Sequence, residues 1–181
     1  MVVIGLWMAM RYSIWLHSLS FKFIWVATVW LIAEHHHWLG TLVIWGYALV
    51  WWANSALRPY LGLSAKALGA GFLCESIFCY SHIALDNTGA PLYFPPLWLL
   101  GLWVAFASLL PFGLASLQKR LWLACLTALI FAPMSYSAGS SWGAMNIRTD
   151  TIGMAVIGLL WGIAFTWLVK ESGNPISTIA P

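Results

Sequence analysis

The chain has 181 residues, of which 62% are hydrophobic and only 7% are charged. A soluble domain carries roughly a quarter charged residues, so this composition excludes a water-exposed surface over most of the molecule. The net charge of +3 comes from scattered residues, and without a dense basic cluster we expect no nucleic-acid partner. The apolar runs are long and do not alternate with polar residues, which favours transmembrane helices over a barrel.

Turn residues divide the chain into six apolar segments, each close to the ~20 residues that cross a bilayer as a helix. We therefore predict an all-α polytopic transmembrane bundle of about six spans. We expect it to form a single integral membrane domain, residues 1–181. The predicted spans are 14–33, 38–57, 64–85, 95–116, 121–145 and 151–169.

The first ten residues are apolar but lack the preceding positive charge and the cleavage site of a signal peptide. One hypothesis is that translation starts at Met8 or Met10, which would leave residues 1–9 outside the true start. Arg11 would then flank the first span.

The lysine and arginine residues predict the orientation, because cytoplasmic loops carry an excess of both. If the N-terminus is inside, Arg148 is the loop cation on the outside. The cytoplasmic set is then Arg11, Arg58, Lys66, Lys119, Arg120 and Lys170. We predict that both termini are cytoplasmic.

A carboxylate, Glu75, lies near the centre of the predicted third span. An ionised carboxylate at that depth costs several kcal/mol unless it is paired, hydrated or protonated. Cys79 and His82 follow about one and two helical turns later, so the three side chains are predicted to form one polar seam. Because burial tunes a carboxyl group for proton transfer, we interpret Glu75 and His82 as candidate catalytic residues.

Lys22 lies near the centre of the first span, at a similar depth, and Ser18 precedes it by one turn. Opposite charges at one depth predict that Lys22 and Glu75 pair or line one polar cavity. The alternative is that Lys22 extends to the membrane surface while Glu75 carries a proton.

The fifth span contains a proline at its centre, Pro133, followed by an unusually polar stretch. By their spacing, Pro133, Tyr136, Ser137 and Ser140 share a helix face. A helix interrupted by proline is a common way to build a site inside a membrane, and it is also an ordinary kink. We interpret Tyr136 as the third candidate catalytic residue and the other three as lining a polar interior.

The segment Glu34–His37 reads Glu-His-His-His, yet adjacent residues on a helix point in different directions. We interpret it as a polar turn and predict no metal site. The alternative is that two of the three histidines converge with Glu34 on a metal ion. The cofactors remain open.

Two stretches resemble a family of small bacterial inner-membrane proteins of unknown function. They are "PPLWLLGLWVAFASLLPFGLASL" (95–117) and "APMSYSAGSSWGAM" (132–145), and the acidic-serine pair Glu75-Ser76 fits as well. The family more often has Asp in place of Glu75 and a polar residue in place of Pro111. The resemblance implies an inner-membrane location and a multi-helix bundle, and it associates the family with genes for fatty-acid modification.

Three functions remain open from the sequence. The first is a membrane-embedded enzyme or accessory subunit that modifies the fatty-acyl chains of membrane lipids, with Glu75, His82 and Tyr136 as its site. The second is a small proton-coupled transporter that uses Lys22 and Glu75. The third is a structural or assembly subunit. The expected partners are membrane lipids, with a second copy of the chain or a membrane enzyme as further alternatives.

Overall fold

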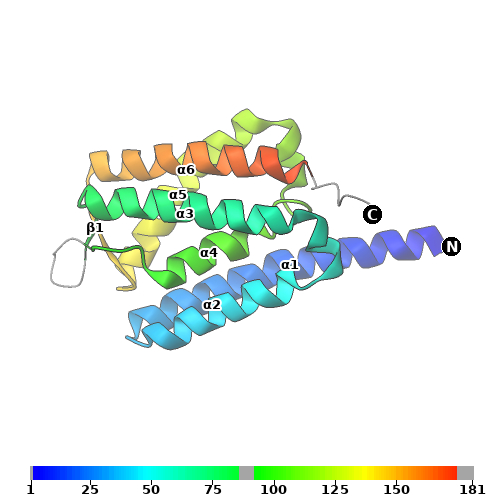
Figure 1. Ribbon diagram of the computed structural model, residues 1–181, viewed down its shortest axis with the longest axis horizontal. Coiled ribbons are helices and arrows are strands. Elements are labelled where there is room, and N and C mark those ends of the chain that lie inside the picture. Colours follow the sequence, from blue (N-terminus) through cyan, green and yellow to red (C-terminus); the bar gives the residue numbers. More distant parts are fainter. Residues whose placement is uncertain (1, 86–91, 175–181) are drawn as a thin grey trace.

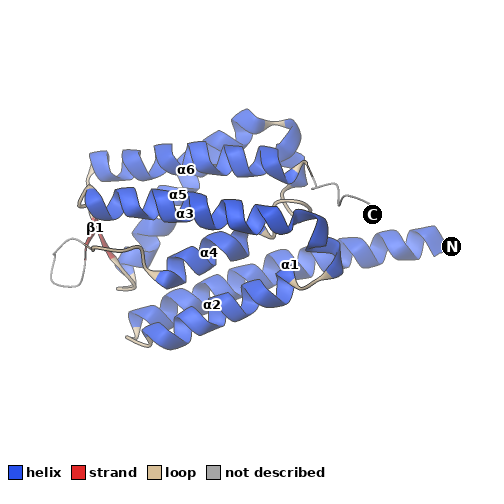
Figure 2. Ribbon diagram, in the orientation of Figure 1, coloured by secondary structure: helices blue, strands red, loops and turns tan. Residues whose placement is uncertain are grey.

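Six α-helices and two short 3₁₀ helices make up most of the computed structural model, which describes residues 2–85 and 92–174 (Figure 2). The α-helices are α1 (Val2–Ala33), α2 (His37–Trp52), α3 (Leu61–Tyr80), α4 (Leu97–Ala107), α5 (Leu121–Ser141) and α6 (Thr151–Ser172). The 3₁₀ helices are η1 (Ser55–Tyr60), before α3, and η2 (Ala115–Lys119), before α5. The described part of the chain is therefore all-α apart from two very short strands, as the composition predicts.

The short helix α4 lies between two groups of longer helices (Figure 1). On one side α1 and α2 form an antiparallel hairpin, and α4 packs against α2. On the other side α4 packs against α3, which also contacts α6, and α6 packs most extensively against α5. The position of α4 thus determines how the two groups of helices meet.

Two strands, β1 (Ala84–Leu85) and β2 (Asn146–Ile147), pair antiparallel at one end of the bundle. Ala84 lies opposite Ile147, and Leu85 lies opposite Asn146. Because the strands follow α3 and α5, the pairing fixes the ends of these two helices relative to each other. We call this end of the bundle the strand end and the opposite one, where α3 and α5 begin, the charged end.

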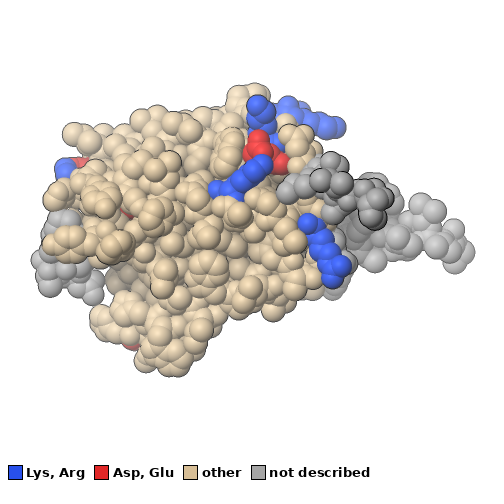
Figure 3. Space-filling model, viewed as in Figure 1, with Lys and Arg blue, Asp and Glu red and all other residues tan. Residues whose placement is uncertain are grey.

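The chain is a membrane protein. Within the described residues, four helical segments are long and apolar enough to cross a bilayer: Trp15–Ala33, Leu57–Tyr80, Leu121–Ser141 and Thr151–Ser172. Large apolar side chains point outward from them, with Phe72 and Ile163 51% and 69% exposed. On the face shown in Figure 3, charged side chains gather toward one end and most of the surface carries none.

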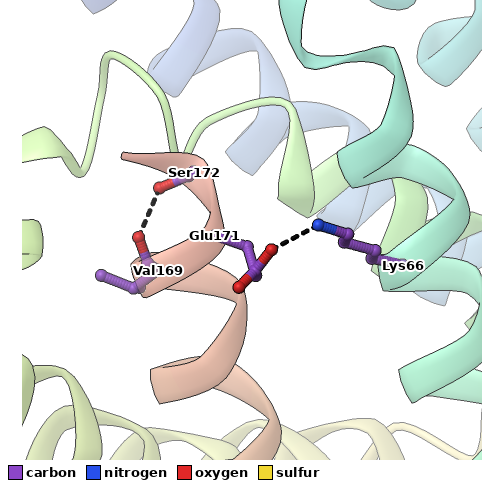
Figure 4. A network of polar contacts seen from close by, with 4 residues as sticks. All are labelled: Lys66, Val169, Glu171 and Ser172. Atoms are coloured by element: carbon purple, nitrogen blue, oxygen red, sulfur yellow. Dashed lines mark hydrogen bonds and ion pairs between the residues drawn. The ribbon is translucent and has the colours of Figure 1, made fainter. Parts of the chain in front are cut away.

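An ion pair joins the helices at the charged end (Figure 4). Lys66, near the start of α3, pairs with Glu171, near the end of α6. Next to this pair, the Ser172 hydroxyl donates to the Val169 carbonyl oxygen at 2.7 Å and accepts from the Gln118 amide of η2 at 3.1 Å. These contacts hold α3, α6 and η2 together where the apolar packing ends.

The second and fourth predicted spans differ from the structure. Span 38–57 is a 16-residue helix that ends at Trp52 and continues into η1. Span 95–116 is helical in its first half only, because α4 begins directly after Pro96, as predicted, but ends at Ala107. Pro111 has no N–H to bond the Ala107 carbonyl oxygen and cannot continue the helix, so Leu110 N–H donates to that oxygen instead, at 3.2 Å.

The end of α4 is buried, and the side chains of Trp52 on α2 and of Ser108, directly after α4, pair its carbonyl groups. Trp52 Nε1 donates to the Val104 oxygen at 3.0 Å, and the Ser108 hydroxyl donates to the Ala105 oxygen at 2.6 Å. The same hydroxyl lies 2.9 Å from His17 Nε2 on α1. Because the hydrocarbon core offers no water, this pairing is what allows a helix to end inside the bundle.

Close packing of α5 against α6 depends on small residues of α6. A Cβ atom added at Gly158 would lie 2.9 Å from the Leu129 carbonyl oxygen, and one at Gly162 would lie 3.3 Å from Leu129 Cγ. Helices that associate in membranes commonly approach each other over such small residues.

We predict that Gly158→Ala lowers the stability of the protein by about 1–3 kcal/mol, because the backbone of α5 must move to admit the methyl group. Unfolding in detergent, followed by circular dichroism, measures the change. The control is Gly46→Ala in α2, where nothing lies within 4 Å of the added Cβ. Equal stability of the two variants would contradict the tight contact.

Candidate functional site

Glu75 lies on α3 with only 1% of its surface exposed, and one of its carboxylate oxygens accepts two hydrogen bonds. Trp103 Nε1 of α4 donates to Oε1 at 3.0 Å, and the Tyr136 hydroxyl of α5 donates to the same oxygen. Trp161 Nε1 of α6 in turn donates to the Tyr136 oxygen at 3.3 Å. These four residues, one from each of four helices, form what we call the Glu75 cluster.

The Glu75 carboxylate is held by neutral donors rather than by a cation. The ion pairs within residues 2–85 and 92–174 are Lys66–Glu171 and Arg148–Asp150, and neither involves Glu75. A carboxyl group at membrane depth without a cationic partner depends on such hydrogen bonds. The hydrogen bond from the Tyr136 hydroxyl links the phenol directly to Glu75 Oε1.

Aromatic rings fix the geometry of the cluster. The Trp103 and Trp161 rings stack with centroids 3.8 Å apart, and Phe78 meets Tyr136 edge to face at 5.7 Å. Gly71, one turn before Glu75 on α3, makes room for the Trp103 indole, because a Cβ added there would lie 2.5 Å from Trp103 Cγ. The indole therefore occupies the space that any other residue at position 71 would need.

A cavity of about 210 Å³ lies beside the cluster and is lined by α1, α4, α5 and α6. Trp103, Tyr136 and Trp161 form part of its wall, whereas Glu75 lies behind them. Apart from these three and the indoles of Trp25 and Trp98, the wall is almost entirely apolar, and its hydroxyl groups are those of Thr127 and Ser135. Tyr136 thus lies between the apolar cavity and the buried carboxylate.

The cavity opens through the side of the bundle. Phe131, 58% exposed, and Ser135, also exposed, both line the cavity on α5. Phe21 and Trp25 of α1 form a wall of the same cavity. Because Phe131 and Ser135 lie well inside an apolar spanning segment, the opening faces hydrocarbon rather than water.

Two of the three predicted catalytic residues, Glu75 and Tyr136, lie together. The predicted polar-interior residues near Tyr136 on α5 point away from the cavity. Pro133 faces α6, with its Cγ 3.3 Å from a Cβ added at Gly158. The Ser137 hydroxyl donates to Met154 Sδ at 3.4 Å.

Ser140 is partly buried, and Cys79 is buried on α3 with 1% exposure. Pro133, Ser137, Ser140 and Cys79 are not among the residues that line the cavity described above. The residues predicted to share one face of α5 therefore point in two directions: Tyr136 contacts α3, whereas Pro133 and Ser137 contact α6.

The predicted pairing of Lys22 with Glu75 is wrong. Lys22 is exposed on α1, whereas the preceding residue, Phe21, faces the cavity. Successive helical residues point about 100° apart, so the two side chains cannot share one direction. Ser18 is partly buried and lies against Gly113, with its Oγ 3.0 Å from a Cβ added there, rather than beside Glu75.

The predicted seam of Glu75, Cys79 and His82 is also wrong at its last member. α3 ends at Tyr80, and His82 lies in the following turn with φ of 56°. Its side chain is exposed and therefore does not continue the buried face that carries Glu75 and Cys79. The helical spacing used for His82 does not apply once the helix has ended.

Trp103 and Trp161 were missed in the sequence, where tryptophan indicates the membrane interface. Their position in the middle of apolar segments, away from the membrane interface, is the sequence feature that could have identified them as site residues. An indole N–H needs an acceptor, and acceptors are scarce at that depth. Glu75 and Tyr136 provide those acceptors.

The histidine-rich turn Glu34–His37 is exposed between α1 and α2. His35 has φ of 65°, and its ring centroid lies 6.2 Å from that of His37. Across the parts of the chain that the structure describes, no three potential metal ligands converge.

Comparison with known families gives one match, to the model described as "Protein of unknown function (DUF2878)", over residues 14–167. The chain belongs to this family. The match includes all four residues of the Glu75 cluster and every residue of the cavity wall. No curated protein and no solved structure matches the chain.

We predict that Gly71→Ala destabilises the protein by about 1–3 kcal/mol, because the new methyl group must displace the Trp103 indole. Thermal unfolding in detergent measures the loss. Gly69→Ala is the matched control on the same helix, since nothing lies within 4 Å of its added Cβ and alanine favours helix. A loss of the same size in both variants would contradict the close approach.

We also predict that the effects of Glu75→Gln and Tyr136→Phe on stability are not additive, because the two side chains share a hydrogen bond. Double-mutant cycles in membranes give about 0.6 kcal/mol per hydrogen bond and up to about 1.7, and we expect a coupling energy in that range. The free energies of unfolding of the wild type, both single variants and the double variant measure it. Additive losses would show that the contact carries no energy.

Proposed function

We propose that this protein acts in the modification of membrane lipids, by binding a lipid from the bilayer in the cavity and presenting it to Tyr136 and Glu75. One observation carries the proposal. A tyrosine whose hydroxyl group is hydrogen-bonded to a buried carboxylate lines an apolar cavity that opens toward hydrocarbon. Such a site suits an apolar substrate that carries one polar group.

In this proposal the roles of the two residues follow from the direction of their hydrogen bond. Tyr136 donates to Glu75 Oε1, so the Tyr136 oxygen can accept a proton from the lipid while its own proton passes to the carboxylate. The reverse transfer returns the proton to the lipid. Trp103 and Trp161 keep the two oxygens in position, and positioned acid–base groups contribute typically ~10²–10⁴-fold to a rate.

The walls of the cavity argue against a proton-coupled carrier. A carrier needs a polar path to the site from both faces of the membrane, and discontinuous helices commonly provide it. Here the helix that breaks, α4, has its end carbonyls paired by Trp52 and Ser108, and the cavity wall is apolar.

We further propose that the charged end faces the cytoplasm of a bacterial cell and that the strand end faces outward. Exposed cations gather at the ends of α3, α5 and α6 that meet there, whereas Arg148 lies beside the strand end. The positive-inside rule gives this orientation. The cations at the charged end are Arg58, Lys66, Lys119, Arg120 and Lys170.

The test is lipid analysis of a strain that lacks the gene and is complemented with variants. We expect wild type to restore the lipid profile, and Glu75→Gln and Tyr136→Phe to reduce the restored product at least ~100-fold, because acid–base transfer is lost. Membrane levels are measured in parallel. The glutamine retains an acceptor oxygen for Trp103, so we expect its level to stay close to wild type.

The controls are Glu34→Gln and Tyr80→Phe, which make the same chemical changes at exposed positions. Both are expected to restore the lipid profile fully. Full restoration by Tyr136→Phe and Glu75→Gln would instead assign the Glu75 cluster to structure alone.

A further inference from the structure

We propose that the cavity holds a single acyl chain with its polar end at Tyr136 and its tail directed toward Thr127 and Phe165. This inference rests on the proposed function and adds the class of ligand and its direction. It follows from the length of the cavity, from the distribution of polar groups along it and from the place of its opening.

The length of the cavity matches one acyl chain. Its wall on α5 extends from Thr127 to Gly139, and Tyr136 lies near the second of these ends. Nine residues separate Tyr136 from Thr127, which is about 14 Å at the rise of an α-helix. The hydrocarbon core of a bilayer is about 30 Å thick and holds two chains end to end, so one chain needs about 15 Å.

The polar groups lie at one end of the cavity. Ser135 and Tyr136 are on the side of the strand end, where the Ser135 hydroxyl can donate to the carbonyl oxygen of a carboxyl or ester group. At the other end the wall is formed by Phe106, Ala128 and Phe165. Thr127 leaves this end of the cavity apolar, because its hydroxyl already donates to the Leu123 carbonyl oxygen at 2.7 Å.

A lipid in the leaflet next to the strand end has the same orientation as the proposed ligand, with its polar end toward the strand end and its tail toward the membrane centre. Tyr136 lies five residues before the end of α5 at Ser141, or about 8 Å along the helix. A lipid whose carbonyl group lies near the membrane surface thus brings it to this depth with its tail pointing inward. It can enter sideways past Phe131 and Ser135 without turning over.

The small volume of the cavity favours a single chain. Small residues on one stripe of α5, namely Ala128, Ala132 and Gly139, leave the space that larger side chains would fill. The volume of about 210 Å³ is below the ~300–1,000 Å³ of pockets for compact drug-sized ligands. One acyl chain fits this volume better than a pair of chains.

The experiment is photo-crosslinking of the full-length protein in lipid nanodiscs with two fatty-acid probes, followed by mass spectrometry of the labelled peptides. One probe carries a diazirine beside its carboxyl group, and the other carries it at the end of its tail. We expect the first to label residues 135–139 and Met145, and the second to label Thr127, Ala128 and Phe165. Leu126 and Ile130, which are exposed on α5, report labelling from bulk lipid.

The outcomes separate the two proposals. Labelling of the cavity in the reverse order would overturn the direction inferred here and leave the proposed lipid site standing. Labelling confined to the outward positions Leu126 and Ile130 would overturn both.

A substitution at the tail end tests the same inference by affinity. We predict that Ala128→Phe weakens binding of a fatty acid of about sixteen carbons at least ~10-fold, which is 1.4 kcal/mol, and leaves one of about ten carbons unchanged. Ile130→Phe, on the exposed side of the same helix, is the control. Ala128→Leu provides a smaller change if the phenylalanine lowers protein yield. An equal loss for both chain lengths would overturn the placement of the tail.

Discussion

The structure depends on one constraint, which is that polar groups within hydrocarbon must find their partners inside the protein. The Glu75 carboxylate satisfies this constraint by accepting hydrogen bonds from two neutral donors, Trp103 and Tyr136. The end of α4 meets it with Trp52 and Ser108, which pair the Val104 and Ala105 carbonyl groups. Trp103, Tyr136 and Trp52 each lie on a different helix from the group to which they donate, so the hydrogen bonds that remove the cost of burial also set how the helices pack.

Much of the fold could be predicted from the sequence, because hydropathy and turn residues report directly on membrane helices. The fifth and sixth spans begin at Leu121 and Thr151, as predicted. The fourth span could not be predicted correctly from hydropathy, since its residues remain apolar after the helix ends. Pro111 was the available signal, but a proline inside an apolar run indicates a kink as readily as a stop. The buried acceptors and donors that allow α4 to end come from α1 and α2.

Sequence reasoning identified the polar members of the candidate site better than it identified their arrangement. Glu75 and Tyr136 stand out as polar groups in apolar segments, and the structure brings them into contact. Which face of each helix points inward depends on packing between distant segments, so Lys22 was given the wrong partner. His82 was misplaced because the end of a helix is uncertain by a few residues, and each residue rotates the side chain by about 100°.

The contact between Gly71 and Trp103 has a consequence for how this family varies. A side chain at position 71 can be admitted only if the ring at position 103 becomes smaller, and a smaller ring without an N–H leaves the acid on α3 with a single donor. Glycine, indole and carboxylate are therefore exchanged as a set or retained as a set. Relatives that have lost the tryptophan should also have lost the acid or replaced its missing donor, which gives the buried triad a signature readable from sequences alone.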